Sequence, residues 1–144
     1  IKGITNGIKI VDDYAHHPTE IKASLKALRN STTNRIWCIF QPHTYTRTKI
    51  LLNSFAESFS EADKVIIPDI YAAREKDNGA IHSTNLVDAL VNNGVDAQYM
   101  SSFKNIEDYI LENAEKGDIV VTMGAGNIYT IGESMLKSSE KEAI

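Results

Sequence analysis

Side chains suited to acid–base and anion chemistry gather in a short stretch near the N-terminus. The segment DDYAHHPTE places Asp12, Asp13, Tyr14, His16 and His17 between an apolar run and the first turn of a predicted helix. Histidine exchanges protons near pH 7, and carboxylates accept hydrogen bonds. The pattern leaves two interpretations open: a functional site, or a strand end at which the aspartates form a turn and cap a helix.

A second polar stretch, QPHTYTRTK, supplies positive charge and hydrogen-bond donors. His43, Arg47 and Lys49 come directly after a predicted buried strand and Pro42. A solvated basic turn would also contain such residues, but this position favours an anion site, because helices that follow buried strands point their N-terminal ends at anions. The adjacent His16 and His17 do not indicate a metal site, since neighbouring side chains diverge and no Cys/His/Asp spacing of a closed site accompanies them.

Two further turns have weaker signals. DIYAARE follows a third strand, and GAGN, with Gly124 and Gly126, follows the last one. GAGN lacks the third glycine of the dinucleotide fingerprint, because Tyr129 stands at that position, so the two glycines are also explained by a tight turn. No G-x-x-x-x-G-K-[ST] loop occurs in the sequence, and we therefore do not expect this chain alone to hold a nucleoside triphosphate in the P-loop manner.

The elements that must position these turns alternate between strand and helix. Asn6-Gly7 predicts a hairpin, and Pro18 starts a predicted helix of about 12 residues. Further strands are predicted at 35–41, 64–69, 96–100 and 118–123, and further helices at 50–59, 86–91, 106–114 and 128–136. The pattern predicts one α/β domain over 1–144, a Rossmann-like three-layer αβα sandwich. Its sheet of about six strands should be mostly parallel, with an antiparallel hairpin at its N-terminal edge.

The predicted topology brings the four polar turns together. Ligands of open parallel sheets bind at the carboxyl ends of the strands, and each of the four turns follows such an end. We therefore expect Tyr14, His43 and Gly124 to lie on the same edge of the sheet. The polar loop at 71–83 is either an exposed connection or a mobile part of that site.

Composition narrows the class of protein. A formal net charge of −4 argues against nucleic acid as a partner. Cys38 is the single cysteine, so the chain has no disulfide framework, and we expect a cytoplasmic protein. No apolar stretch approaches the ~18 residues that a membrane span requires. The chain begins at Ile1 within a predicted strand, and we expect it to be part of a longer polypeptide.

The four blocks DDYAHHPTEI, FQPHTYTRTK, DIYAARE and GAGNI together resemble the C-terminal domain of the Mur ligases of bacterial peptidoglycan synthesis. The similarity covers nearly the whole chain. It is strongest to the ligases that join L-alanine to UDP-N-acetylmuramate, because the related murein-peptide recycling ligase lacks QPHTYTRT. Thr44 departs from the family pattern, in which arginine is frequent, so an anion site here would depend more on Arg47.

The resemblance implies a three-domain, ATP-dependent ligase whose N-terminal domain binds the UDP-sugar and whose central domain binds ATP and supplies most of the Mg²⁺ ligands. The sugar carboxylate becomes an acyl phosphate, which the amine of L-alanine attacks, while the C-terminal domain closes over the central one. This implies that the isolated fragment is inactive. The implied roles are catalysis for His16, His43 and Arg47, amino-acid binding for Tyr14, His17, Tyr45 and Arg47, and nucleotide contacts for Asp12 and Asp13, with no metal ligand in this chain.

Two alternatives of other classes remain. One is a complete Rossmann-like module that binds a nucleotide cofactor alone, which requires GAGN to hold a pyrophosphate. The other is an anion-binding or protein-interaction domain without enzymatic activity, in which the histidines and aspartates have incidental roles.

Overall fold

The computed structural model describes the backbone of residues 1–142 and the side chains of residues 1–138. Six strands form one sheet in the order β1-β2-β6-β3-β4-β5. All neighbouring strands are parallel except β1 and β2, as predicted. The strands are β1 (Gly3–Thr5), β2 (Ile8–Asp13), β3 (Ile36–Phe40), β4 (Lys64–Ile67), β5 (Ala97–Tyr99) and β6 (Ile119–Met123).

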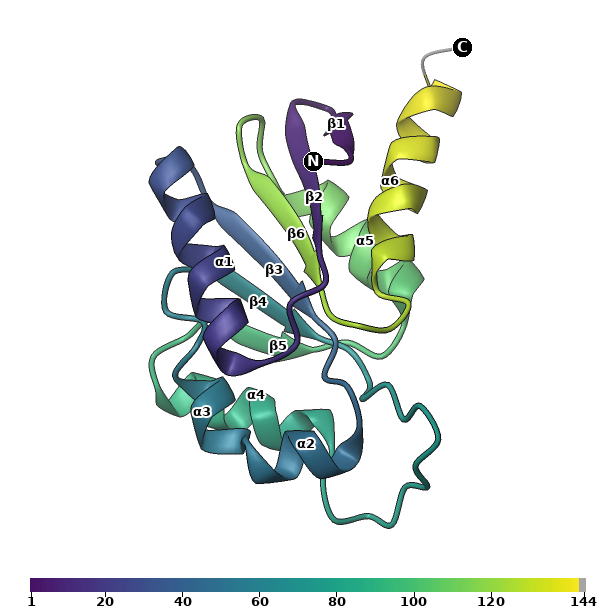
Figure 1. Cartoon of the computed structure of the whole chain (residues 1–144). Helices are drawn as coiled ribbons and strands as arrows, with labels where there is room; N and C mark the ends of the chain where they lie inside the picture. The colour runs from purple at the N-terminus through teal and green to yellow at the C-terminus, as the bar shows by residue number, and fades with distance from the viewer. Residues whose placement is uncertain (143–144) are drawn as a thin grey trace.

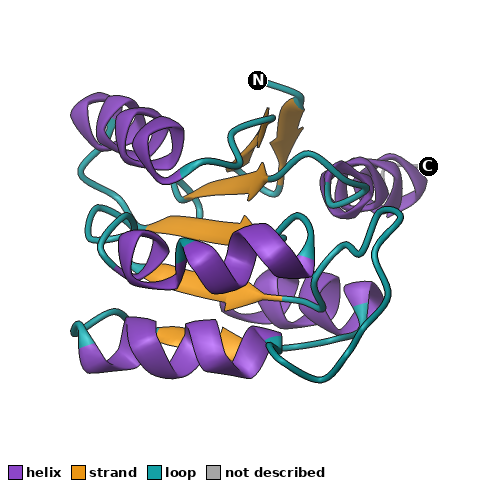
Figure 2. Cartoon of the chain, turned by 60° about the horizontal axis from the view of Figure 1, so that its bottom comes forward, coloured by secondary structure: helices purple, strands orange, loops and turns teal. Residues whose placement is uncertain are grey.

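Helices cover both faces of this sheet (Figure 1, Figure 2). The helices are α1 (Pro18–Ser31), α2 (Tyr45–Ile50), α3 (Leu52–Ala56), α4 (Ser83–Asn92), α5 (Phe103–Asn113) and α6 (Tyr129–Glu142). None of the helices in the described part of the chain is long and apolar enough to cross a membrane. The three-layer α/β architecture is therefore confirmed.

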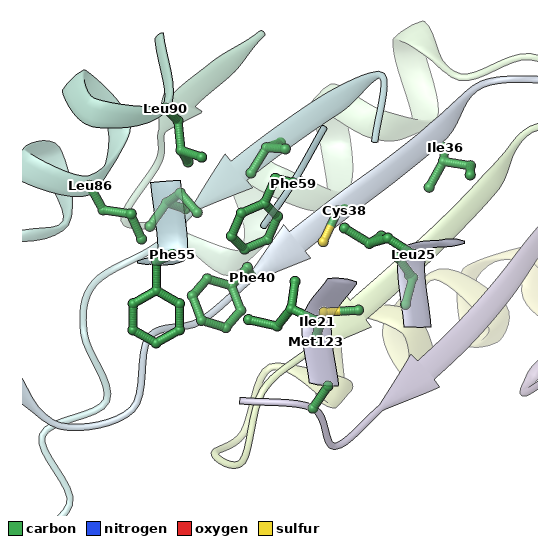
Figure 3. Close-up of a cluster of buried hydrophobic side chains, with 14 of the residues drawn as sticks. Ile21, Leu25, Ile36, Cys38, Phe40, Phe55, Phe59, Leu86, Leu90 and Met123 are labelled. Carbon is green, nitrogen blue, oxygen red and sulfur yellow. The ribbon is translucent and has the colours of Figure 1, made fainter. Parts of the chain in front are cut away.

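The buried side chains form two clusters, one on each face of the sheet. Alternate residues of β3 separate them: Ile36, Cys38 and Phe40 face one cluster, and Trp37 and Ile39 face the other. The first cluster includes side chains from α1, α3 and α4 (Figure 3), and the second includes side chains from α5 and α6. Strands buried on both faces read as continuous apolar runs, which is why β3 was recognisable in the sequence.

The N-terminal hairpin follows from local turn chemistry. Asn6 and Gly7 have φ angles of 51° and 78°, and Thr5 pairs with Ile8 across the turn. Positive φ at both central residues is the requirement that Asn-Gly meets in a two-residue hairpin. The first strand begins at Gly3, two residues later than predicted.

The predicted helix at 50–59 is wrong in its bounds. The chain forms two short helices, α2 and α3, interrupted at Leu51, whose φ and ψ are −100° and 15°. Ile50 is 74% exposed and does not belong to the apolar face, while Phe59 lies beyond α3 yet is fully buried against Phe40. The spacing of apolar residues predicted one helix because it cannot distinguish a buried residue within a helix from a buried residue in the turn that follows it.

Candidate active site at the carboxyl ends of the strands

The first and last polar turns are joined through the backbone. The amide of Gly124 donates to the carbonyl of Asp13 at 3.1 Å. Asp12 Oδ1 accepts from the Thr122 hydroxyl at 2.8 Å, and Asp13 Oδ1 accepts from the amide of Ala15 at 2.8 Å. One oxygen of each carboxylate thus has a structural role, as expected of aspartates at a strand end.

Helix α1 is capped by Glu20 rather than by either aspartate. Glu20 Oε1 accepts from the amides of His16 and His17 at 3.2 and 3.1 Å, and Pro18 occupies the first helical position. These two hydrogen bonds lower the pKa of the Glu20 carboxyl. They also fix the backbone from which both imidazoles project.

The hydrogen bond of His16 assigns its tautomer. His16 Nδ1 lies 3.0 Å from the carbonyl oxygen of Tyr14. A carbonyl only accepts, so Nδ1 carries the proton, and the Nε2 of the neutral ring presents a lone pair. The Tyr14 ring packs edge-on against the His16 ring, with their centroids 5.4 Å apart, and the His17 centroid lies 4.8 Å from that of His16. His16 is therefore held as a potential proton acceptor.

His43 has the opposite arrangement. Its Nδ1 lies 3.2 Å from Arg47 Nη1. A guanidinium only donates, so Nδ1 of His43 is the acceptor and Nε2 carries the proton. Burial lowers the pKa of His43, with smaller contributions from Arg47 and His16, while Glu75 opposes the shift. The neutral ring is thus a donor through Nε2–H.

Among the described side chains, Arg47 forms no ion pair. Its guanidinium donates a hydrogen bond to His43. The ring centroids of His16 and His43 are 6.1 Å apart. A cation, an N–H donor and a proton acceptor are therefore grouped on one edge of the sheet. This combination suits a reaction in which negative charge develops while an amine loses a proton.

The third turn contributes two residues that the sequence interpretation missed. Tyr71 stacks on His43 with ring centroids 5.5 Å apart and an interplanar angle of 18°. Glu75 Oε1 accepts from the amides of Tyr45 and Thr46 at 2.6 and 3.0 Å. The available sequence signal was the aromatic residue and the acid at the two ends of YAARE, a stretch that follows a predicted strand as the basic turn does.

The glycines of GAGN allow close packing. Gly124 has a φ of 148°, and a Cβ there would lie 2.9 Å from the carbonyl of Gln41. A Cβ at Gly126 would lie 2.6 Å from Gln41 Oε1 and 2.7 Å from the Tyr71 ring. The loop supports Tyr71, and its glycines are used in contacts within the domain.

Tyr45 lines two cavities, and neither of them includes His16, His17 or His43. It lines a 670 Å³ cavity together with Lys49, Ile50 and residues of the 71–81 loop, and a 320 Å³ cleft together with Asp69, His82 and Tyr99. Among the described residues, no group of three or more His, Cys, Asp or Glu side chains is arranged to hold a metal ion. The predicted site residues lie at the predicted edge, where the strands have their carboxyl ends, with Tyr14, His43 and Gly124 on adjoining turns.

Comparison with known proteins agrees with this geometry. Residues 1–126 match the family model described as Mur ligase, glutamate ligase domain. The chain belongs to this Mur ligase family. The Mur ligase domain is 56% identical, over all 144 residues, to UDP-N-acetylmuramate–L-alanine ligase of Acetivibrio thermocellus, and 55% identical over 141 residues to the ligase of that name from Caldanaerobacter subterraneus.

The Mur ligase domain spans 31% of the length of each of these two relatives, and 100% and 98% of its own length is covered. Among solved structures, the murein peptide ligase of Psychrobacter arcticus superposes on 94% of the domain with a TM-score of 0.77 and 27% identity, and the match covers 28% of that protein. The predicted family and fold are confirmed.

Proposed function

We propose that this domain is the C-terminal part of an ATP-dependent ligase that joins L-alanine to UDP-N-acetylmuramate in cytoplasmic peptidoglycan synthesis. The observation that carries the proposal is the 56% identity, over the whole length of this domain, to a protein named UDP-N-acetylmuramate–L-alanine ligase. The murein peptide ligase shares the fold at 27% identity, which makes peptide recycling the less favoured function.

ATP and Mg²⁺ would be held mainly by a central domain of the same polypeptide. The sequence has no phosphate loop, and the described residues form no metal-binding group, so this domain does not fit either role alone. ATP would supply the phosphoryl group that activates the sugar carboxylate. Asp12 and Asp13 would meet the nucleotide through the carboxylate oxygens that are not engaged by Thr122 and Ala15.

Arg47 and His43 would stabilise negative charge as the tetrahedral intermediate forms and phosphate leaves. Their contact orients the guanidinium and leaves the Nε2–H of His43 as a second donor. Donors that are fixed before the reaction stabilise charge without reorganisation, and removing one of them from such a site lowers kcat by about 10² to 10³.

His16 would accept the proton that the alanine ammonium must lose before it attacks. Its Nε2 lone pair and its Nδ1–H bond to the Tyr14 carbonyl support this role, which requires a base with a fixed tautomer. Tyr14, 70% exposed, and His17, exposed at the start of α1, are placed to contact the amino acid as the domains close. Tyr45 would act from the neighbouring cleft.

The proposal is tested in the full-length parent enzyme with UDP-N-acetylmuramate, ATP and either L-alanine or a murein peptide as the amine. We expect ligation of L-alanine, and a fall in kcat of about 10² to 10³ for Arg47→Ala. Lys26→Ala, which removes an exposed positive charge on α1, is the control. Preference for the peptide would assign the domain to the recycling enzyme, and near-normal ligation with alanine at positions 16, 43 and 47 together would make their roles incidental.

The isolated domain supplies a second test. We expect it to ligate nothing and to bind ATP and NAD only very weakly, because the loop with Gly124 and Gly126 is packed against Gln41 and Tyr71. Tight binding of NAD to this chain alone would instead support an independent nucleotide-binding module.

A further inference from the structure

The turn between β3 and α2 contains a strained residue. Thr44 has a φ of 65° and a ψ of 146°, a region in which residues with a Cβ are rare. Such a conformation persists only where surrounding contacts enforce it. Thr44 lies beside His43 and three residues before Arg47, so its backbone sets how these two side chains meet.

Part of the enforcement comes from α2 itself. The Thr44 hydroxyl accepts from the amide of Arg47 at 3.3 Å, and the Thr44 carbonyl accepts from the hydroxyl of Thr48 at 2.7 Å. A helix of six residues has too few internal hydrogen bonds to be stable alone, so these contacts are not sufficient to hold the turn.

The third turn supplies the remaining contacts. The amide of Thr44 donates to the carbonyl of Tyr71 at 2.8 Å, and Glu75 Oε1 accepts from the amides of Tyr45 and Thr46. Ala73, with a φ of 55°, turns the chain so that Glu75 returns to α2. Two residues with positive φ and a Cβ therefore lie at this junction.

These contacts also occupy the amides of the first turn of α2. Tyr45 and Thr46 donate to Glu75, and Arg47 donates to Thr44. Those N–H groups are engaged within the domain, so the anion chemistry depends on the side chains of His43 and Arg47 and on their orientation.

We propose that Glu75 is a positioning residue that binds the first turn of α2, keeps Thr44 in its strained conformation, and so holds His43 and Arg47 in contact. The effect on ligation rests on the proposed function. The effect on geometry concerns this chain alone.

The geometric part is tested by NMR on the 144-residue chain, with the contact between the His43 and Tyr71 rings as the readout. Glu75→Ala is expected to lose this contact. Glu75→Gln is expected to keep it, because the amide oxygen accepts the same two hydrogen bonds. Adding Thr44→Gly to Glu75→Ala is expected to restore it, since glycine adopts positive φ without strain and serves as an N-cap.

The functional part uses the same variants in the full-length enzyme. We expect Glu75→Ala to lower kcat about tenfold or more with little change in the KM for ATP, because misplacement of positioned groups affects the chemical step. Glu75→Gln and Thr44→Gly/Glu75→Ala should remain within about threefold of the wild type. Glu112→Ala, an exposed acid on α5, is the matched control.

The outcomes separate the two proposals. Intact ring contacts in Glu75→Ala, or a Thr44→Gly/Glu75→Ala variant as impaired as Glu75→Ala, would overturn the positioning role while leaving the ligase function in place. A full-length enzyme that does not ligate alanine would overturn the ligase function, while the NMR result would still decide the role of Glu75. If Glu75→Ala does not fold, equal damage by Glu75→Gln would count against the inference.

Discussion

Gly126→Ala tests whether the GAGN loop supports the imidazole site by packing. The added Cβ would lie 2.7 Å from a Tyr71 ring carbon and 2.6 Å from Gln41 Oε1. Carbon atoms pack at about 3.5 Å, so the ring must move by about 0.8 Å or the loop must shift. Tyr71 stacks on His43, and the displacement is therefore transmitted to the site.

The expected cost is that of inserting a methyl group into a close-packed region, about 1 to 3 kcal/mol. For a domain of this size each kcal/mol lowers Tm by roughly 2 to 4 °C, so we expect a fall of roughly 2 to 12 °C. Tyr71→Ala removes the obstructing ring and leaves the clash with Gln41 as the main one. Gly126→Ala should therefore cost less stability in the Tyr71→Ala background than in the wild type.

Thermal unfolding of the two single variants and of the double variant measures this coupling. NMR titration of His43 reports whether its environment changes with the loop. A Tm within about 1 °C of the wild type for Gly126→Ala, or costs for Gly126→Ala and Tyr71→Ala that simply add, would refute the packing explanation.

Two further predictions concern the titration of the site and the stability of the fold. Burial and Arg47 lower the pKa of His43 below its ordinary 6.5, so protonation opposes folding, and the stability from the neutral ring is lost as pH falls from 6.5 through the folded pKa. In an NMR titration, we expect Arg47→Gln to raise the pKa of His43 and Lys49→Gln to leave that pKa unchanged. Asp118 is buried and accepts from Trp37 Nε1 at 3.1 Å and from two backbone amides. Asp118→Ala should lower the free energy of unfolding by about 3 to 5 kcal/mol in urea denaturation, and a loss below about 1 kcal/mol would contradict this.

The order of the elements was predictable because its signals are local. Asn6-Gly7 requires only its own φ angles, and the apolar run of β3 requires only burial on both faces. The split between α2 and α3 was not predictable. Ile50 and Phe59 fit helical spacing, yet the first is exposed and the second packs from a turn, because packing against Phe40 decides which residues are buried.

The sequence by itself determined the fold class, the family and the edge of the sheet on which the polar turns meet, because parallel strands joined by helices place all their carboxyl ends together. It did not determine which side chains contact one another there. Arg47 meets His43, Tyr71 covers that ring, and Glu75 occupies the amides of α2. The last two contacts join turns about 30 residues apart in the chain, and only the packed tertiary structure brings such residues within hydrogen-bonding or stacking distance.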